Sequence, residues 1–81
     1  MLYGPWDTDV EAHIEAGGTV RITSFTWQGR RLPVIGSGRT WHDESGRHFL
    51  VMAPGEAVFE LCLNDAGQWQ VLRAPDGPYV A

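Results

Sequence analysis

The sequence predicts a small all-β domain: an antiparallel meander of six or seven short strands that forms a small, partly open barrel or a strongly bent sheet. Two observations support this fold class. Ten glycines and five prolines divide the 81 residues into short segments, and apolar and polar residues alternate within those segments, as they do in half-buried antiparallel strands. Helical periodicity is almost absent from the chain.

Residues 9–16 suit either a short helix or a strand. In a helix Val10 and Ile14 would share one face, whereas a strand would explain why apolar and polar residues alternate here. We favour the strand, because Ala16-Gly17-Gly18 can turn the chain directly into the next segment, 19–27.

That next segment changes the phase of its alternation partway along. Val20 and Ile22 lie in one phase of the alternation, whereas Phe25 and Trp27 lie in the other. This change of phase predicts a β-bulge near Ser24. A tight turn at Gln28-Gly29 then starts the following strand. In that strand Pro33, which has no amide proton, lies opposite the bulge, where a missing ladder hydrogen bond is tolerated.

Three later hairpins are predicted to share one design, a three-residue loop between alternating strands. The loops are Glu44-Ser45-Gly46, Pro54-Gly55-Glu56 and Asp65-Ala66-Gly67. The registers that keep apolar residues on one face give the opposed pairs Ile14–Val20, Ala12–Ile22, Phe25–Leu32, Ile22–Val34, Trp41–Phe49, Asp43–Arg47, Val51–Phe59, Phe49–Leu61, Leu63–Trp69 and Leu61–Val71. The predicted core is Val20, Ile22, Phe25, Leu32, Val34, Trp41, Phe49, Val51, Phe59, Leu61, Leu63, Trp69 and Val71.

The chain is predicted to form one domain, because 81 residues are too few for two hydrophobic cores. We expect an ordered core over about residues 10–73 within the single domain 1–81. Residues 1–9 and 74–81 lack alternation, so we interpret them as tails or docked arms.

Composition disfavours nucleic-acid binding and excludes a membrane span and an internal disulfide. Six arginines and no lysine stand against ten acidic residues, for a net charge of −4. Nucleic-acid binding is therefore disfavoured, since it needs a surplus of positive charge, although a local basic patch stays open. The apolar runs are too short to cross a membrane, and a single cysteine cannot form an internal disulfide. We expect a cytoplasmic protein that uses no cofactor and binds no membrane.

No catalytic motif is present. The candidate nucleophiles Ser24, Ser37, Ser45 and Cys62 lie outside nucleophile-elbow and cysteine-protease signatures. We therefore expect a protein that is not an enzyme.

Trp27, Arg30 and Arg31 surround the predicted Gln28-Gly29 turn and form the first candidate binding site. The register pairs Trp27 with Arg30, whose guanidinium could stack on the indole ring. Such a hairpin tip could bind a phosphate, a carboxylate or a base. Alternatively, Arg30 covers the edge of a core tryptophan and Arg31 is solvated.

His42, His48 and Cys62 form a second candidate site. If Asp43 lies opposite Arg47, then His42 lies opposite His48, and the next pairing sets His48 opposite Cys62. Two imidazoles and a thiolate suit Zn²⁺, and three protein ligands with one open position are typical of a catalytic zinc site. The alternatives are a titrating histidine pair or an ordinary surface row.

Leu50, Met52, Val58 and Leu72 alternate with the core residues and so form a third candidate site, an apolar patch on the second face of the sheet. Such a patch needs a cover or marks an interface. The ends of the chain could cover it, through Leu2, Tyr3 and Trp6 or through Tyr79 and Val80. Otherwise we expect a protein partner or a second copy of the chain.

Several stretches resemble a family of small bacterial domains of unknown function. The resemblance spans about residues 20–73 and rests on an F-x-W-x-G-R-R hairpin at 25–31, the central Trp41, an R-x-F-x-V strand at 47–51, an aromatic-E-L strand at 59–61 and a closing W-x-L strand at 69–73. Members can occur near error-prone DNA polymerase genes, so the resemblance implies a link with DNA damage tolerance. The family has no known catalytic residues.

Taken together, these features favour a non-catalytic β-domain that acts as a protein interaction or adaptor module. The alternatives are the metal site at His42, His48 and Cys62 and a nucleic-acid accessory domain linked to DNA damage tolerance.

Overall fold

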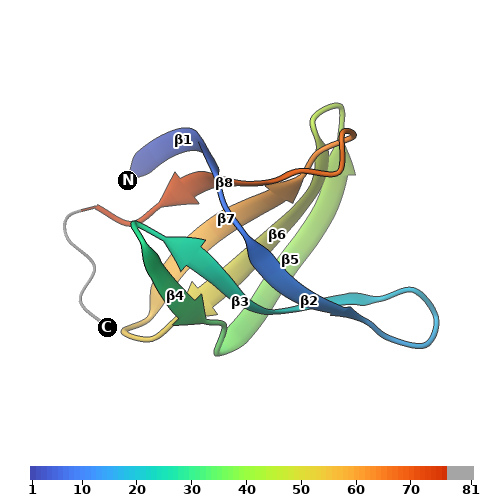
Figure 1. Cartoon of the computed structure of the whole chain (residues 1–81), viewed down its shortest axis with the longest axis horizontal. Helices are drawn as coiled ribbons and strands as arrows, with labels where there is room; N and C mark the ends of the chain where they lie inside the picture. The colour runs from blue at the N-terminus through green and yellow to red at the C-terminus, as the bar shows by residue number, and fades with distance from the viewer. Residues whose placement is uncertain (77–81) are drawn as a thin grey trace.

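The computed structural model describes residues 1–76, which form eight antiparallel β-strands in two sheets (Figure 1). A five-stranded sheet has the order β1-β8-β7-β6-β5, and a three-stranded sheet has the order β2-β3-β4. The strands are β1 (Leu2–Asp7), β2 (Val10–Ile14), β3 (Val20–Trp27), β4 (Arg30–Pro33), β5 (Gly36–Asp43), β6 (Gly46–Ala53), β7 (Ala57–Leu63) and β8 (Trp69–Ala74).

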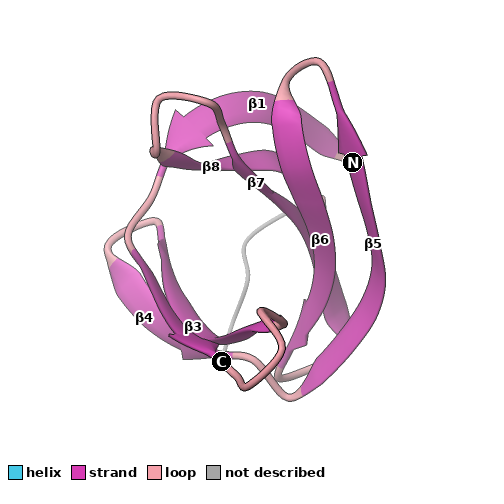
Figure 2. Ribbon diagram, turned by 90° about the vertical axis from the view of Figure 1, so that its right-hand side faces the viewer, coloured by secondary structure: helices cyan, strands magenta, loops and turns pink. Residues whose placement is uncertain are grey.

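The predicted fold class, all-β and antiparallel, is confirmed. The predicted number of six or seven strands is too low, because residues 2–7, despite their irregular sequence, pair with β8 as an edge strand. Residues 1–76 do not close into a barrel. The two sheets instead curve toward each other around a shared interior (Figure 2).

The chain passes from one sheet to the other at two corners. At the first, Thr8 Oγ1 donates a hydrogen bond of 2.5 Å to the carbonyl of Thr26 in β3. At the second, the Val34 amide donates to the Thr23 carbonyl of β3 at 2.9 Å, and the next amide, that of Ile35, donates to the Met52 carbonyl of β6 at 2.8 Å. Each corner thus fixes one sheet against the other.

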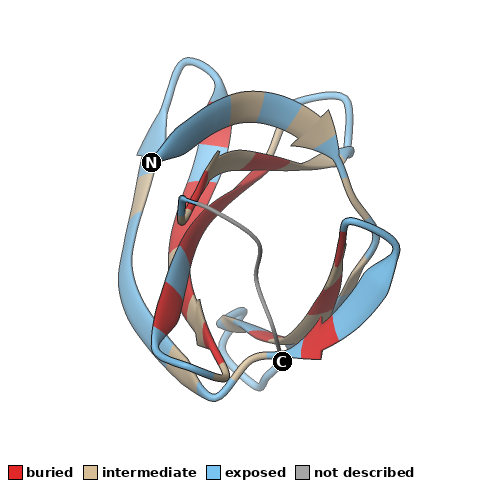
Figure 3. Cartoon of the chain, turned by 90° about the vertical axis from the view of Figure 1, so that its left-hand side faces the viewer, coloured by how far each residue is buried: buried red, intermediate tan, exposed pale blue. Residues whose placement is uncertain are grey.

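The core lies between the sheets, and both sheets carry buried residues along their strands (Figure 3). Aromatic rings fill its centre: Phe59 contacts Phe25 and Trp27 edge to face, and Trp6 from β1 contacts Trp27 in the same way. The buried apolar residues are Ile22, Phe25, Trp27, Leu32, Phe49, Val51, Ala53, Ala57, Phe59, Leu61, Cys62, Val71 and Ala74. Most of the predicted core is confirmed, with Val20, Val34, Leu63 and Trp69 half-buried against it.

Most predicted registers are confirmed as well. The observed pairs include Ile14–Val20, Ala12–Ile22, Phe25–Leu32, Val51–Phe59, Phe49–Leu61, Leu63–Trp69 and Leu61–Val71. The bulge expected near Ser24 lies in β3 where it pairs with β2. Because β3 has no extra residue on the side of β4, the predicted pair Ile22–Val34 is wrong, and Val34 bonds to Thr23 instead.

The register of the β5–β6 hairpin differs from the prediction by one residue. The loop has two residues rather than three, so Asp43 lies opposite Gly46 and Trp41 opposite His48. The predicted pairs Trp41–Phe49 and Asp43–Arg47 are therefore wrong. Two features explain the tighter loop. The Asp43 carboxylate accepts a hydrogen bond from the Ser45 amide at 2.9 Å, as in an Asx turn. Gly46 lies so close to β7 that a Cβ on it would be 2.2 Å from the Leu63 carbonyl oxygen.

This shift moves Trp41 out of the core, where the sequence had placed it. Opposed residues share a face of the sheet, so Trp41 lies with His48 on the face turned away from the three-stranded sheet, which we call the outer face. Thr40 takes the inward position opposite Phe49.

Candidate functional site

A chain of polar side chains centred on His48 crosses the outer face from β5 to β8, and we call it the His48 network. His48 Nδ1 lies 2.9 Å from Glu60 Oε2, and its Nε2 lies 2.8 Å from Asp43 Oδ1. Arg73 Nε donates to Glu60 Oε1 at 2.5 Å. The Ser45 hydroxyl donates to Asp43 Oδ1 at 2.6 Å and lies 3.1 Å from His48 Nε2. The network therefore ties the β5–β6 turn to β7 and β8.

The centre of this network is buried although it lies on an outer face. His48 is 3% exposed and Glu60 8% exposed. The Trp41 indole covers the His48 ring in a flat stack, with ring centroids 5.0 Å apart and an angle of 4° between the planes. The Arg39 guanidinium lies 5.2 Å above the same indole. Trp41 thus separates two cationic groups and keeps water from the inner one.

The geometry indicates that His48 carries a positive charge. A neutral imidazole has one N–H donor, whereas both ring nitrogens of His48 have a carboxylate within hydrogen-bond distance. Burial by itself would lower the pKa of His48, but hydrogen bonds to Asp43 and Glu60 outweigh it, and the pKa is raised above 6.5. Hydrogen bonds from Ser45 and His48 hold the pKa of Asp43 well below its usual range.

Ser45, His48 and Glu60 have the connectivity of a nucleophile, a base and an orienting acid. Hydrolysis by such a triad requires a neutral base that accepts the hydroxyl proton. Here the Ser45 hydroxyl and His48 Nε2 both approach the same oxygen of Asp43, so a protonated His48 has no lone pair for that proton. As long as His48 is protonated, this arrangement is a charged structural network and does not activate the serine.

The predicted row of metal ligands is not formed. His42 lies opposite Arg47 and is exposed, so it is not beside His48. The pairing of His48 with Cys62 is confirmed, but the Cys62 Sγ is a buried thiol that lies 3.7 Å from the Ser45 carbonyl, and burial raises its pKa. Within residues 1–76, no three histidine, cysteine or acidic side chains are grouped so that they could hold a metal ion.

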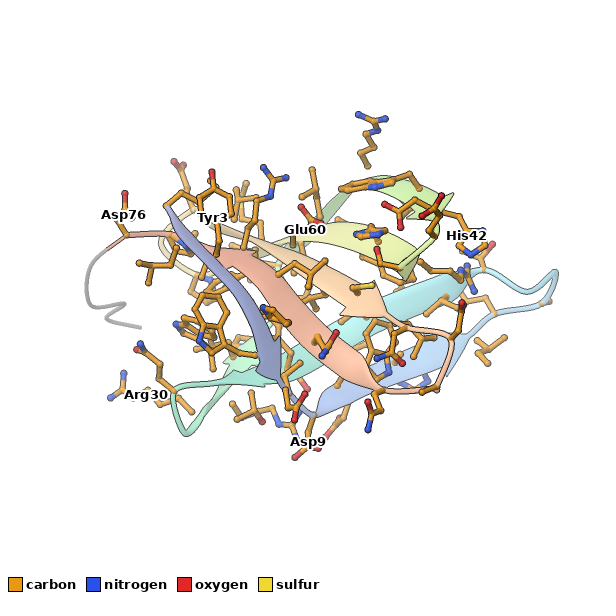
Figure 4. The ribbon with its side chains drawn as sticks, turned by 90° about the horizontal axis from the view of Figure 1, so that it is seen from above. Tyr3, Asp9, Arg30, His42, Glu60 and Asp76 are labelled. Atoms are coloured by element: carbon orange, nitrogen blue, oxygen red, sulfur yellow. The ribbon has the colours of Figure 1, made fainter. Side chains whose placement is uncertain are left out.

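The predicted hairpin-tip site is divided between the core and the surface. Trp27 pairs with Arg30 as expected, but the residue is 8% exposed and its ring contacts Trp6. Arg30 is exposed at the tip (Figure 4), and Arg31 donates from Nη1 to the Asp9 carbonyl at 3.2 Å. The tip therefore offers solvent two guanidinium groups but no open aromatic face.

An apolar depression of about 220 Å³ lies on the outer face beside β5, and we call it the β5 depression. Three of the four predicted patch residues line it, namely Leu50, Met52 and Val58. Leu72 is half-buried and lies outside it. The β5 residues around it are small, Gly36, Ser37 and Gly38. A Cβ on Gly38 would lie 3.5 Å from the Leu50 Cβ, so the missing side chain leaves the depression open.

The N-terminal segment does not cover this depression, contrary to one of the two expectations. β1 and β5 are opposite edges of the five-stranded sheet, Tyr3 is 71% exposed, and Trp6 packs on Trp27. Tyr79 and Val80 lie outside the described residues.

The sequence analysis considered Ser45 only as a nucleophile and Asp43 only as a partner of Arg47, and it missed Glu60, Arg73 and the role of Trp41. One signal was present: Glu60 is a charged residue in the apolar run Phe59 to Leu63, where a carboxylate needs a partner. Comparison with protein-family models, curated protein sequences and solved structures found no match to this chain. Across residues 1–76 no helix has the length and apolar character needed to cross a membrane.

Proposed function

We propose that this domain is a non-catalytic protein interaction module, which binds an extended segment of a partner protein along the free edge of β5. The observation that carries the proposal is the β5 depression, an apolar hollow directly beside a sheet edge. Strand addition uses such an arrangement, since the edge supplies backbone hydrogen bonds and the hollow takes alternate side chains. In this proposal the two sheets act together as a partly open barrel.

The edge itself is accessible. Within residues 1–76, β5 pairs with β6 and with no other strand, and residues 37–40 are exposed. A β-bulge between Ser37 and Thr40 places two β5 residues opposite Leu50. Bulges interrupt uniform pairing at an edge, so they limit indiscriminate association and favour a segment that matches the local shape.

The charges favour a partner segment over a second copy of the chain. Arg39 is the one charged side chain over residues 36–41, so a carboxylate on the bound segment would meet a complementary charge. Two copies paired symmetrically along this edge would instead bring their Arg39 side chains toward each other, and each copy carries a net charge of −4. The expected occupant is an extended segment with apolar residues and an acidic residue.

NMR titration of the ¹⁵N-labelled protein with a short peptide of alternating valine and threonine, with and without one glutamate, tests this proposal. We expect shift changes in β5 and at Leu50, Met52 and Val58, and weaker binding without the glutamate. Val58 is 42% exposed, so V58D should fold normally and lose at least tenfold in affinity. I14D is the matched control, because Ile14 is 78% exposed on β2 and its substitution should leave binding unchanged.

Two results would overturn the proposal. One is shift changes confined to strands of the three-stranded sheet. The other is sedimentation equilibrium that shows a dimer which V58D dissociates, because the depression would then belong to a self-association interface.

A further inference from the structure

We propose that His48 is a proton-operated latch on the β5–β6 hairpin. With the proton bound, the ring ties Asp43 to β7. When the proton leaves, the Ser45 hydroxyl turns from Asp43 to His48 Nε2, and Asp43 is released to solvent. The latch lies in the hairpin itself and does not depend on the proposed binding function.

The first step follows from donor counting. The protonated ring donates Nδ1–H to Glu60 and Nε2–H to Asp43, at 2.9 and 2.8 Å. A neutral ring can keep one of these donations, and the other nitrogen then turns a lone pair toward a carboxylate, which is repulsive. Loss of the proton must therefore break one of the two bonds.

The surroundings decide which bond breaks. The Glu60 side chain is 10% exposed and is also held by Arg73 Nε, so losing its ring donor would leave a buried carboxylate short of a partner. The Asp43 side chain is 49% exposed and can be solvated. The neutral ring thus keeps Nδ1–H on Glu60, and Nε2 becomes an acceptor.

The Ser45 hydroxyl is placed to donate a hydrogen bond to the unprotonated Nε2 of His48. Ser45 Oγ lies 3.1 Å from Nε2 and 2.6 Å from Asp43 Oδ1, so rotation of the hydroxyl proton exchanges one acceptor for the other. The Asp43 carboxylate thereby loses its hydrogen bonds from His48 Nε2 and from the Ser45 hydroxyl. It keeps the hydrogen bond from the Ser45 amide, at 2.9 Å.

No other charged group described near the ring takes over the role of the His48 proton in holding Asp43. On β5, Arg39 is separated from the imidazole by Trp41. On β7, the thiol of Cys62 is kept neutral by burial. On β8, Arg73 reaches the ring only through Glu60. The groups that face His48 from β5, the turn, β7 and β8 are Asp43, Trp41, Ser45, Glu60, Cys62 and Arg73.

Histidine-side-chain ¹⁵N NMR of the whole chain between pH 4.5 and 9 tests the latch directly. Below the transition both His48 nitrogens should carry protons. Above it, Nδ1 should stay protonated while Nε2 shifts to the position of an acceptor, and amide protection over residues 43–46 should fall. A neutral His48 at pH 5, or a proton retained on Nε2 instead of Nδ1, would overturn the proposal.

Two variants assign the transition. D43N keeps the side-chain shape and removes one carboxylate, so the His48 midpoint should fall by about one pH unit or more. H42Q removes the exposed imidazole of the same hairpin and should leave the transition unchanged. An unchanged midpoint in D43N, or loss of the amide response in H42Q, would contradict the latch.

Discussion

The two ends of the outer face contrast, although the same strands build both. At one end Trp41 closes over His48, and the polar groups beneath it are paired. At the other end Gly36 and Gly38 leave the apolar side chains of β6 and β7 open to solvent. The difference arises in β5, whose residues change from small to bulky within a few positions.

The contrast shows how a single edge strand can divide one face into a closed, polar part and an open, apolar part. The closed end buries a histidine and a carboxylate, and within residues 1–76 no buried side-chain nitrogen or oxygen lacks a hydrogen-bond partner. Polar groups that are buried and fully paired specify one arrangement. The open end buries no such polar group, so its side chains are not fixed by internal hydrogen bonds, and it is the part of the face where we propose that a partner binds.

Substitution of Glu60 at the closed end should lower the free energy of unfolding the most. E60A removes a carboxylate that pairs with both His48 and Arg73, and it leaves Nδ1 of the buried imidazolium without an acceptor while Asp43 still pairs with Nε2. We expect a loss of about 3 kcal/mol in the free energy of unfolding, measured by urea denaturation at pH 6. E44A, an exposed position in the same hairpin, should change it by less than about 0.5 kcal/mol. Equal effects of the two substitutions would contradict the claim that the His48 network stabilises this end of the sheet.

The stability of the closed end should also depend on pH. The folded-state pKa of His48 is raised above 6.5, so its contribution is fully present below pH 6.5 and is lost as the pH rises through the folded-state pKa. The pKa of Asp43 is lowered from 3.8, so its contribution is present above pH 3.8 and is lost as the pH falls. Urea denaturation should therefore show greatest stability between these values, and H48Q should flatten the decline on the alkaline side.

The smallest effect should come from filling the open end. A Cβ on Gly38 makes ordinary contact with Leu50, and alanine is favoured over glycine within a strand by about 0.5–1 kcal/mol. G38A should therefore raise the free energy of unfolding slightly while it narrows the depression and weakens peptide binding in the NMR titration. Weaker binding together with lower stability would instead indicate that the strand is distorted.

The sequence allowed a good prediction of the sheet where alternation is strict. In β6, β7 and β8 the apolar phase fixes the register, because a slip of one residue would turn Phe49, Phe59 and Val71 toward solvent. The β5–β6 hairpin could not be placed in this way. Its register depends on the Asp43 side chain accepting the Ser45 amide and on the close approach of Gly46 to Leu63, and the second of these is a tertiary contact.

The candidate site was less predictable than the fold for the same reason. The apolar patch follows from alternation along β6 and β7, and three of its four residues do line one depression. The His48 network joins residues from 43 to 73, which meet only once three registers and a bulge in β8 are correct. An error of one residue at Asp43 was enough to place His42 rather than Trp41 beside His48.

The corner at Val34 and Ile35 has a consequence for how the domain comes apart. Two consecutive amides donate hydrogen bonds to different sheets. The sheets therefore cannot move apart unless at least one of these two hydrogen bonds breaks. The domain should consequently unfold cooperatively, with the slowest-exchanging amides of both sheets sharing one opening free energy. A chain this small gains from that coupling, because neither sheet alone could bury enough apolar surface to persist.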